Sequence, residues 1–297
     1  MTDKSALSMS TLDCNGRILN LSIPQIMGVL NVTPDSFSDG GIFFRGNRLD
    51  INLAFERAEQ MVAEGASIID VGGESTRPGA DSVGVQEEMD RVLPVVEKIA
   101  AELDVIISID TSKPELMSGG AAAGAGMIND VRALTQKGAV EAAAMSGSAV
   151  CLMHMQGQPK TMQQAPSYAS VINEVIEFLS SRIEICSSAG IDKTQILIDP
   201  GFGFGKTPEH NLVLLNELSK FLALGCGLVV GLSRKSIIAA VLNRPVEDRL
   251  PASLALAVMA VERGANIVRA HDIKATSDAI HMAIAVKEAV MTGSNHD

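Results

Sequence analysis

Polar side chains follow short apolar runs at several places along this chain. Residues 26–30 are apolar and Asn31 comes next, and residues 105–109 lead in the same way to Asp110. Apolar runs of this length between polar or helical stretches are typical of buried strands. The candidate strand ends carry amides, carboxylates, imidazoles and cations: Asn31, Glu74, Asp110, Asn129, Asp130, His154, Asp199, Arg234, Lys235, Arg269 and His271.

Cationic residues in three motifs suit an anionic ligand. The motif VGGESTRPGA presents Arg77 between glycines and a proline, and an arginine can donate two parallel hydrogen bonds to an anion. VRAHD supplies Arg269 and His271, and GLSRKS leads into a helix, where backbone N–H groups attract carboxylate or phosphate. Asn31 offers a carbonyl oxygen to a cation or an N–H to an anion. We therefore expect the cations to surround a highly charged leaving group and Asn31 to hold a metal ion.

Acidic and amide residues suggest a second ligand-binding surface. Asp110 ends the motif ISID, Asn129 lies in IND, and Asp199 lies in LIDPGFGFG. Two carboxylates and an amide suit a flat heterocycle with adjacent N–H donors, such as a 2-amino-4-oxo ring. Lys235 is a candidate donor to the acceptors of that ring.

The glycine-rich motif after Asp199 permits close backbone approach. Gly203 lies between Phe202 and Phe204, either of which is a candidate for packing on a ring, although both also suit an apolar core. The motif resembles a phosphate-binding loop, but the first glycine of that template falls on Pro200. Lys235 as a Schiff-base lysine is the alternative chemistry, and it does not require so many acids and amides.

The spacing of the apolar runs predicts how these residues are positioned. Eight runs alternate with amphipathic stretches, which is the repeat of a (β/α)8 TIM barrel in the α/β class. The predicted strands are 26–30, 67–71, 105–109, 126–128, 149–153, 196–198, 228–230 and 266–268. The predicted helices are 50–64, 87–103, 113–123, 138–145, 168–189, 208–218, 236–242, 251–263 and 275–290. The carboxyl ends of barrel strands share one face, so the polar residues should meet there.

A β-hairpin is predicted before the first barrel strand. Asn15-Gly16 lies between two short apolar segments, and this dipeptide favours a type I′ turn. Such a hairpin would cover the bottom of the barrel. We expect residues 1–10 to be a disordered leader, 11–291 to form one domain and 292–297 to be a flexible tail.

Composition limits the classes of partner. The chain has 297 residues and a net charge of −11, which argues against nucleic acid or an anionic membrane surface. No apolar run approaches the roughly 20 residues of a membrane span. Four cysteines lack the pairing or spacing of a zinc site, and the N-terminus has no apolar signal core, so we expect reduced thiols and a cytoplasmic protein.

These motifs together identify a family resemblance. GVLNVTPDSFSDGG, DVGGESTRPGA, ISIDTSKP, MINDVRAL, CLMHMQGQPKTMQ, LIDPGFGFGKT, GLSRKS and VRAHD resemble the dihydropteroate synthase family, in order and over nearly the whole chain. The resemblance implies a homodimer that joins 6-hydroxymethyl-7,8-dihydropterin diphosphate to 4-aminobenzoate in an SN1-like reaction. It also implies Mg2+, and sulfonamides as inhibitors that mimic 4-aminobenzoate.

The resemblance implies roles for individual residues. The pterin pocket would comprise Asp110, Asn129, Met153, Asp199 and Lys235. The diphosphate site would comprise Asn31, Arg77, Arg269 and His271, with Mg2+ near Asn31. The 4-aminobenzoate site would comprise Phe37, Thr76, Pro78, Gly203, Phe204, Lys235 and Ser236. Catalysis would fall to Asp110, Asp199, Lys235, Arg269 and His271, and the loops at 33–41 and 75–80 would close over the site.

Two alternatives stay open on the sequence. A pterin-binding methyltransferase barrel would share the acidic and amide pocket but would need no diphosphate site. A non-catalytic barrel that binds pterin or acts as a scaffold would retain the same motifs without turnover.

Overall fold

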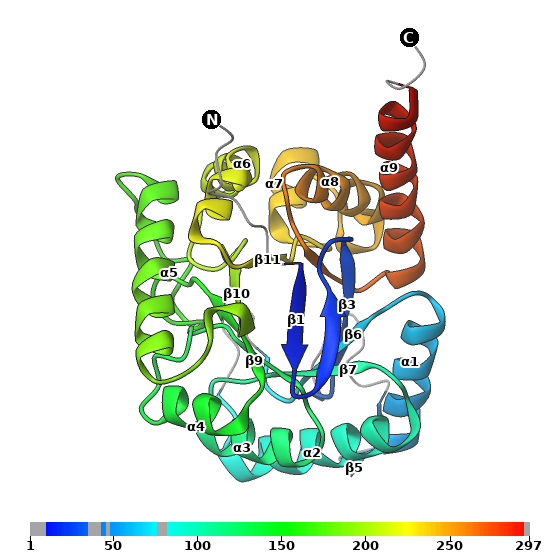
Figure 1. Cartoon of the computed structure of the whole chain (residues 1–297), viewed down its shortest axis with the longest axis vertical. Coiled ribbons are helices and arrows are strands. Elements are labelled where there is room, and N and C mark those ends of the chain that lie inside the picture. Colours follow the sequence, from blue (N-terminus) through cyan, green and yellow to red (C-terminus); the bar gives the residue numbers. More distant parts are fainter. Residues whose placement is uncertain (1–9, 35–42, 46–47, 76–81, 294–297) are drawn as a thin grey trace.

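Eight parallel strands close into a barrel in the computed structural model, which describes residues 10–34, 43–45, 48–75 and 82–293 (Figure 1). Going round the barrel, the strands pair in the order β3-β6-β7-β8-β9-β10-β11-β12 before β12 returns to β3. Their bounds are β3 Gln25–Asn31, β6 Ile68–Gly72, β7 Ile106–Asp110, β8 Met127–Asp130, β9 Ala149–Met153, β10 Ile196–Asp199, β11 Gly227–Val230 and β12 Ile267–Ala270. The predicted (β/α)8 barrel is confirmed.

Helices surround the barrel, and most follow a strand directly (Figure 1). Their bounds are α1 Ile51–Ala63, α2 Val85–Glu102, α3 Pro114–Ala122, α4 Ala139–Ser146, α5 Val171–Ser188, α6 Pro208–Asn216, α7 Ser236–Leu242, α8 Leu250–Glu262 and α9 Ile273–Gly293. Short 3-10 helices occupy η1 Lys193–Gln195, η2 Leu218–Leu224 and η3 Val246–Asp248. Each predicted helix has a counterpart whose ends lie within three residues of the predicted ends.

The predicted N-terminal hairpin is present as β1 Thr11–Cys14 and β2 Arg17–Asn20. Asn15 and Gly16 have φ values of 56° and 86°, and two positive φ values are required by a type I′ turn. A Cβ on Gly126 would lie 2.4 Å from the carbonyl oxygen of Cys14, so only glycine lets the hairpin sit this close to the barrel.

The hairpin covers the amino ends of the barrel strands, as predicted. Its buried side chains share one cluster with inward residues of the strands: Leu12, Cys14, Leu19, Leu21, Met27, Ile68, Ile106, Met127, Ala149, Cys151, Leu197, Val229 and Ile267. This cluster fills the lower barrel. The carboxyl ends of the strands therefore remain as the open mouth.

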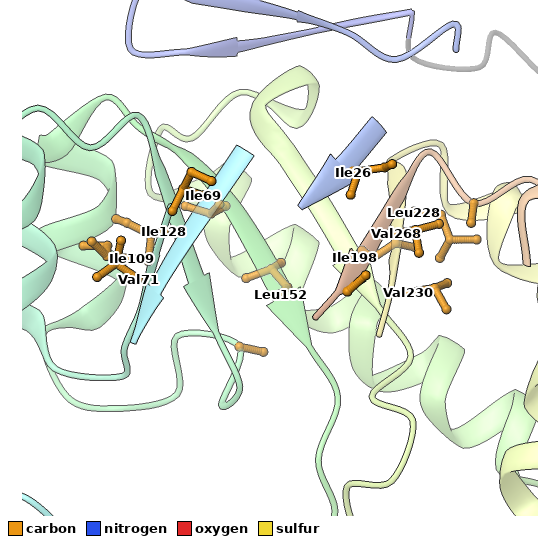
Figure 2. Close-up of a cluster of buried hydrophobic side chains, with 14 of the residues drawn as sticks. Ile26, Ile69, Val71, Ile109, Ile128, Leu152, Ile198, Leu228, Val230 and Val268 are labelled. Atoms are coloured by element: carbon orange, nitrogen blue, oxygen red, sulfur yellow. The ribbon is translucent and has the colours of Figure 1, made fainter. Parts of the chain in front are cut away.

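Alternation along each strand decides which side chains face the interior. In β6, Ile68 belongs to the interior cluster, whereas Ile69 and Val71 pack in the outer core between the strands and helices. Figure 2 shows part of that outer layer. The same period of two turns Asp70 in β6 and Asp110 in β7 toward the interior.

A small hairpin departs from the prediction. The strands β4 Phe44–Arg45 and β5 Arg48–Leu49 pair antiparallel after the first barrel strand. Each has two residues, which is too short for a hydrophobic period to be seen in the sequence. None of the helices in the described part of the chain is long and apolar enough to cross a membrane.

Candidate active site at the carboxyl ends of the strands

A cavity of about 1130 Å³ opens at the mouth of the barrel. It is lined by the ends of β3, β7 and β12 and by the loops after β6, β9, β10 and β11. Many of the predicted site residues line it together: Asn31, Asp110, Gly203, Phe204, Lys235, Ser236, Arg269 and His271. Residues from strands that are far apart in the sequence thus meet on one face, and their individual roles stay predictions.

Three predicted pterin residues adjoin this cavity without lining it. Asn129, Met153 and Asp199 are only 5–6% exposed, and Asp199 pairs with Met153 in the register of β10 and β9. The predicted residues Phe37, Thr76, Arg77 and Pro78 lie outside the described residues, as does most of the two loops expected to close.

Buried carboxylates hold the guanidinium of Arg269 in place. Its Nε donates to Oδ2 of Asp70 at 2.7 Å, and its Nη2 donates to Oδ2 of Asp110 at 2.9 Å. Asn129 also donates to Oδ2 of Asp70, from Nδ2 at 3.0 Å. Arg269, predicted to bind the diphosphate, and Asp110 and Asn129, predicted to bind the pterin, therefore belong to one hydrogen-bonded network.

Asp70 is the residue of this network that the sequence analysis missed. It lies in the middle of an apolar strand and not at its end, where the functional residues were sought. A lone carboxylate within a run such as Ile-Ile-Asp-Val-Gly was the available signal, because a buried strand rarely contains an unpaired charge.

The charge state of Asp110 depends on this network. Burial raises its pKa to about 7, Arg269 opposes that rise, and the neighbouring carboxylate of Asp70 adds to it. For Arg269, burial acts to lower the pKa, but Asp70 and Asp110 outweigh burial and raise it. Arg269 thus stays a cation, whereas Asp110 can take up a proton near neutral pH.

Lys235 reaches the cavity from the other side. Burial lowers the pKa of its amine to about 8, and the carboxylate of Asp199 opposes this. Its Nζ donates to the carbonyl of Phe202 and lies 4.5 Å from the ring centre of Phe204. Asp199 accepts a hydrogen bond from the backbone N–H of Gly201 at 2.7 Å. The amine therefore lies over an aromatic ring, and the charge of Asp199 raises its pKa.

The two phenylalanines of the glycine-rich loop have different roles. Phe202 is 1% exposed and belongs to the outer core, whereas Phe204 lines the cavity. Gly203 has a φ of 81°, and a Cβ there would lie 3.2 Å from the side chain of Lys235. Phe204 is therefore the phenylalanine placed to pack on a ligand.

His271 and Ser233 line the same cavity as Asn31 and Arg269. The side chains of His271 and Ser233 are 3.0 Å apart, from Nδ1 to Oγ, and Arg57 donates to the carbonyl of His271 at 3.2 Å. The motif after β12 is thus fixed at both its backbone and its side chain.

Asp130 was predicted at the mouth, and the structure places it elsewhere. It is fully buried and accepts hydrogen bonds from the backbone N–H groups of Arg132 at 2.9 Å and Leu134 at 2.7 Å. It follows Asn129 directly, so alternation turns it away from the barrel interior. Asp130 stabilises the turn after β8.

His154 was also predicted at the mouth and instead faces the surrounding helices. Its Nδ1 lies 2.9 Å from Nζ of the buried Lys206, and its ring packs edge-on against Phe178 with centres 5.0 Å apart. Burial lowers the pKa of His154 to about 3, and the charge of Lys206 lowers it further. Met153, one residue earlier, takes the inward position.

The displaced pKa of His154 predicts a pH-dependent stability. Unfolding returns the imidazole to an ordinary pKa near 6.5, so the unfolded chain binds more protons between about pH 3 and 6.5. From pH 6.5 to 5.0 this group should lower the free energy of unfolding by up to about 2 kcal/mol. In urea unfolding, the free energy of unfolding of His154→Gln should fall less than that of the parent over the same pH interval.

The control for this measurement is His281→Gln, a change at an exposed position on α9. Protonation of Asp110 acts in the opposite direction in this interval, because its pKa is raised in the folded state. The difference between parent and variant removes that contribution. Equal slopes for the parent and His154→Gln would contradict the prediction.

The loop after β9 adds two lining residues that were not predicted. Met162 and Gln163 line the cavity, and Nε2 of Gln163 donates to the carbonyl of Gly203 at 2.5 Å. They belong to the motif CLMHMQGQPKTMQ, whose polar residues beyond a strand end were the available signal.

The chain is similar to known proteins over most of its length. The pterin binding enzyme family matches residues 27–271, which include the described site residues. The chain belongs to the pterin-binding enzyme family. It is 52% identical to dihydropteroate synthase of Escherichia coli strain K12 over 278 residues, covering 94% of this chain and 97% of that relative.

Solved structures of pterin-binding enzymes share the fold. A Yersinia pestis dihydropteroate synthase with a sulfonamide drug complex is 49% identical, with a TM-score of 0.90, covering 94% of this chain and 99% of that one. A Xanthomonas albilineans dihydropteroate synthase in complex with 7,8-dihydropteroate is 41% identical, with a TM-score of 0.81, covering 94% and 98%.

Proposed function

We propose that this chain is a dihydropteroate synthase of folate biosynthesis. It joins 6-hydroxymethyl-7,8-dihydropterin diphosphate to 4-aminobenzoate and releases diphosphate and 7,8-dihydropteroate. The observation that carries this proposal is the lining of one cavity by Asp110 and Lys235, which suit a pterin, and by Asn31, Arg269 and His271, which suit a diphosphate. Relatives similar over nearly the whole chain are named for this activity.

The pterin side uses acids, an amide and an amine. The carboxylates of Asp110 and Asp199 accept hydrogen bonds from the N–H groups of the ring, and Asn129 and Lys235 pair with its remaining polar atoms. Met153 packs nearby. This arrangement is supported by the burial of Asp110, Asn129 and Asp199, since little water competes for their hydrogen bonds.

The reaction begins with departure of diphosphate. The carbon–oxygen bond to the diphosphate breaks and its electron pair leaves with the diphosphate, whose added charge is stabilised by Arg269 and His271. The pterin carries the positive charge until the amine of 4-aminobenzoate forms the new carbon–nitrogen bond. The bonded nitrogen then becomes acidic and releases its proton, so no strong general base is required.

Asn31 fits a role in holding Mg2+. Its Oδ1 lies 3.3 Å from the position of a Cβ on Gly72, so glycine leaves room beside this oxygen. No group of three His, Cys, Asp or Glu residues among the described residues could hold a metal, but Mg2+ commonly takes one or two protein ligands and completes its shell with phosphates and water. When bound, Mg2+ supplies neutralisation of diphosphate charge.

The second substrate lies against Phe204 and Gly203, with Lys235 and Ser236 beside its carboxylate. The roles of Phe37, Thr76 and Pro78 rest on the family resemblance alone. A sulfonamide should compete with 4-aminobenzoate here, and support comes from the sulfonamide complex of the Yersinia relative. The loops at 33–41 and 75–80 would close to exclude water from the charged pterin.

A diphosphate-release assay tests this function. With pterin diphosphate and Mg2+, release should depend on 4-aminobenzoate and be blocked by a sulfonamide. A pterin-binding methyltransferase or a non-catalytic pterin-binding barrel would release no diphosphate. Arg269 and His271 favour the synthase over the methyltransferase, because a methyltransferase needs no diphosphate site. Diphosphate release itself distinguishes the synthase from the non-catalytic barrel. Absence of release from folded protein that binds pterin would overturn the proposal.

The active form is proposed to be a homodimer. Exposed apolar side chains on α8 and α9, namely Met259, Met282 and Val286, support a partner on this side of the barrel. The double variant Met282→Glu with Val286→Glu should shift the mass in light scattering from two chains to one. A dimeric double variant would exclude this face as the interface.

A cytoplasmic location is part of the same proposal. The four cysteines are buried and free of disulfides, as suits a reducing compartment. Expression in a cell followed by fractionation tests this, with the activity expected in the cytoplasmic fraction.

A further inference from the structure

Asp70 is a fully buried carboxylate that the proposed chemistry does not use. It lies at the centre of β6, two residues before the end of the strand, with hydrophobic neighbours Ile69 and Val71 on either side. Burial of a charge is costly unless the charge is paired and hydrogen-bonded. The hydrogen-bond partners of Asp70 must therefore offset the cost of burying its carboxylate.

The partners of Asp70 come from opposite sides of the barrel. Arg269 on β12 donates from Nε at 2.7 Å, and Asn129 on β8 donates from Nδ2 at 3.0 Å, and both bonds reach the same oxygen, Oδ2. The other oxygen, Oδ1, accepts no hydrogen bond from any residue that the structure describes. One oxygen atom thus fixes the direction of two side chains.

These two side chains belong to different parts of the site. Asn129 is assigned to the pterin and Arg269 to the diphosphate, so Asp70 connects the two ends of one substrate. We propose that Asp70 is a positioning residue. It holds Asn129 and Arg269 in the geometry that binds pterin diphosphate and promotes the departure of diphosphate. This inference rests on the proposed function for the diphosphate part, whereas the pterin part requires only pterin binding.

Arg269 shows why the position of Asp70 matters. The guanidinium lies between two carboxylates, donating to Asp70 and, at 2.9 Å, to Asp110. Without Asp70, Asp110 is the carboxylate among the described residues that still forms an ion pair with Arg269, and the guanidinium can move toward it. A displacement of about 1 Å in a reacting site can lower a rate about 100-fold.

Two substitutions separate the functions of the carboxylate. Asp70→Ala removes the acceptor, so Asn129 and Arg269 both lose the hydrogen bond that orients their side chains. Asp70→Asn keeps one oxygen that can accept both hydrogen bonds but removes the charge. The control is Ser108→Ala, because Ser108 pairs with Asp70 in register, is fully buried and has an Oγ without a hydrogen-bond partner among the described residues.

The first readout is calorimetric binding of 6-hydroxymethylpterin, which lacks diphosphate. Asp70→Ala should weaken this binding about 10-fold, whereas Asp70→Asn and Ser108→Ala should stay within about twofold of the parent. The second readout is steady-state diphosphate release. Asp70→Ala should lower kcat about 100-fold with the KM for 4-aminobenzoate changed less than about twofold, and Asp70→Asn should lower kcat about 10-fold.

Double variants exclude a merely structural effect. Asp70→Ala combined with Asn129→Ala should bind 6-hydroxymethylpterin no more than about twofold more weakly than Asn129→Ala alone, because Asp70 acts on pterin through Asn129. Asp70→Ala combined with Arg269→Ala should likewise have a kcat within about threefold of Arg269→Ala alone. A general weakening of the fold would make the losses multiply.

The outcomes are distinct for each part. The inference would be overturned if Asp70→Ala had the same pterin affinity and kcat as Ser108→Ala. It would also be overturned if the losses multiplied in full in the double variants. If Asp70→Ala does not fold, Asp70→Asn decides the matter, and its unchanged kcat would overturn the inference. If the parent releases no diphosphate, the proposed function fails while the pterin-binding comparison still tests the link from Asp70 to Asn129.

Discussion

Replacing Arg269 with alanine should lower kcat/KM for pterin diphosphate by about 100- to 1000-fold, the range expected when a preorganised donor to developing charge is removed. The structure gives this residue two roles at once. It lines the cavity as a cation, and it separates the carboxylates of Asp70 and Asp110. The substitution therefore removes charge stabilisation and also leaves two acids facing each other.

The second role predicts a loss of stability that depends on pH. Breaking a buried ion pair by removing one partner costs about 3 kcal/mol or more, because the other charge stays buried. Arg269 holds down the pKa of Asp110, which is about 7 even in its presence. Without Arg269 that pKa should rise further, so the variant should lose most stability above pH 7 and least near pH 5.

Two controls accompany this variant. Arg263→Ala removes a half-buried arginine outside the cavity that donates to the carbonyl of Met259 on α8, and it should leave the activity unchanged. Arg269→Lys keeps the charge, but a lysine amine cannot bridge two carboxylates as the planar guanidinium does. Its kcat/KM should therefore lie between those of the parent and Arg269→Ala. Unchanged kcat/KM in Arg269→Ala would remove this residue from the diphosphate site.

Replacing Asp199 with asparagine should weaken pterin binding about 10- to 100-fold, since hydrogen bonds to charged groups contribute roughly 1.5–3 kcal/mol. Asp199 is 6% exposed, and burial raises the pKa of its carboxyl while Lys235 lowers it. The amide is nearly the same size, and its oxygen can still accept from Gly201. The substitution therefore removes chiefly the negative charge that interacts with the pterin ring and with Lys235.

Titration calorimetry with a pterin measures this loss directly. The matched control is Asp192→Asn, because Asp192 also accepts a backbone N–H, from Thr194 at 2.8 Å, but lies on the surface before η1. Loss of the Asp199 charge should also lower the pKa of Lys235 below about 8, since Asp199 contributes more than Asp110 to raising it. Undiminished pterin affinity in Asp199→Asn would exclude Asp199 from the pocket.

The sequence by itself determined the repeat and the polar strand ends. Eight apolar runs separated by helical stretches predicted the barrel, and Asn15-Gly16 predicted the turn of the covering hairpin. These are local signals, set by hydrophobic period and by the φ values that a turn requires. Motifs in order along the chain were enough for the family resemblance.

The tertiary structure alone decided which of those polar residues share the cavity. Side chains alternate every residue, and strand ends cannot be placed to one residue from apolar runs, so Asn129 and Asp130 were indistinguishable until the barrel closed. The same parity turned His154 outward to Lys206. Asp70 and Arg269 are 199 residues apart, and only closure of β12 against β3 brings both into one interior where their charges meet.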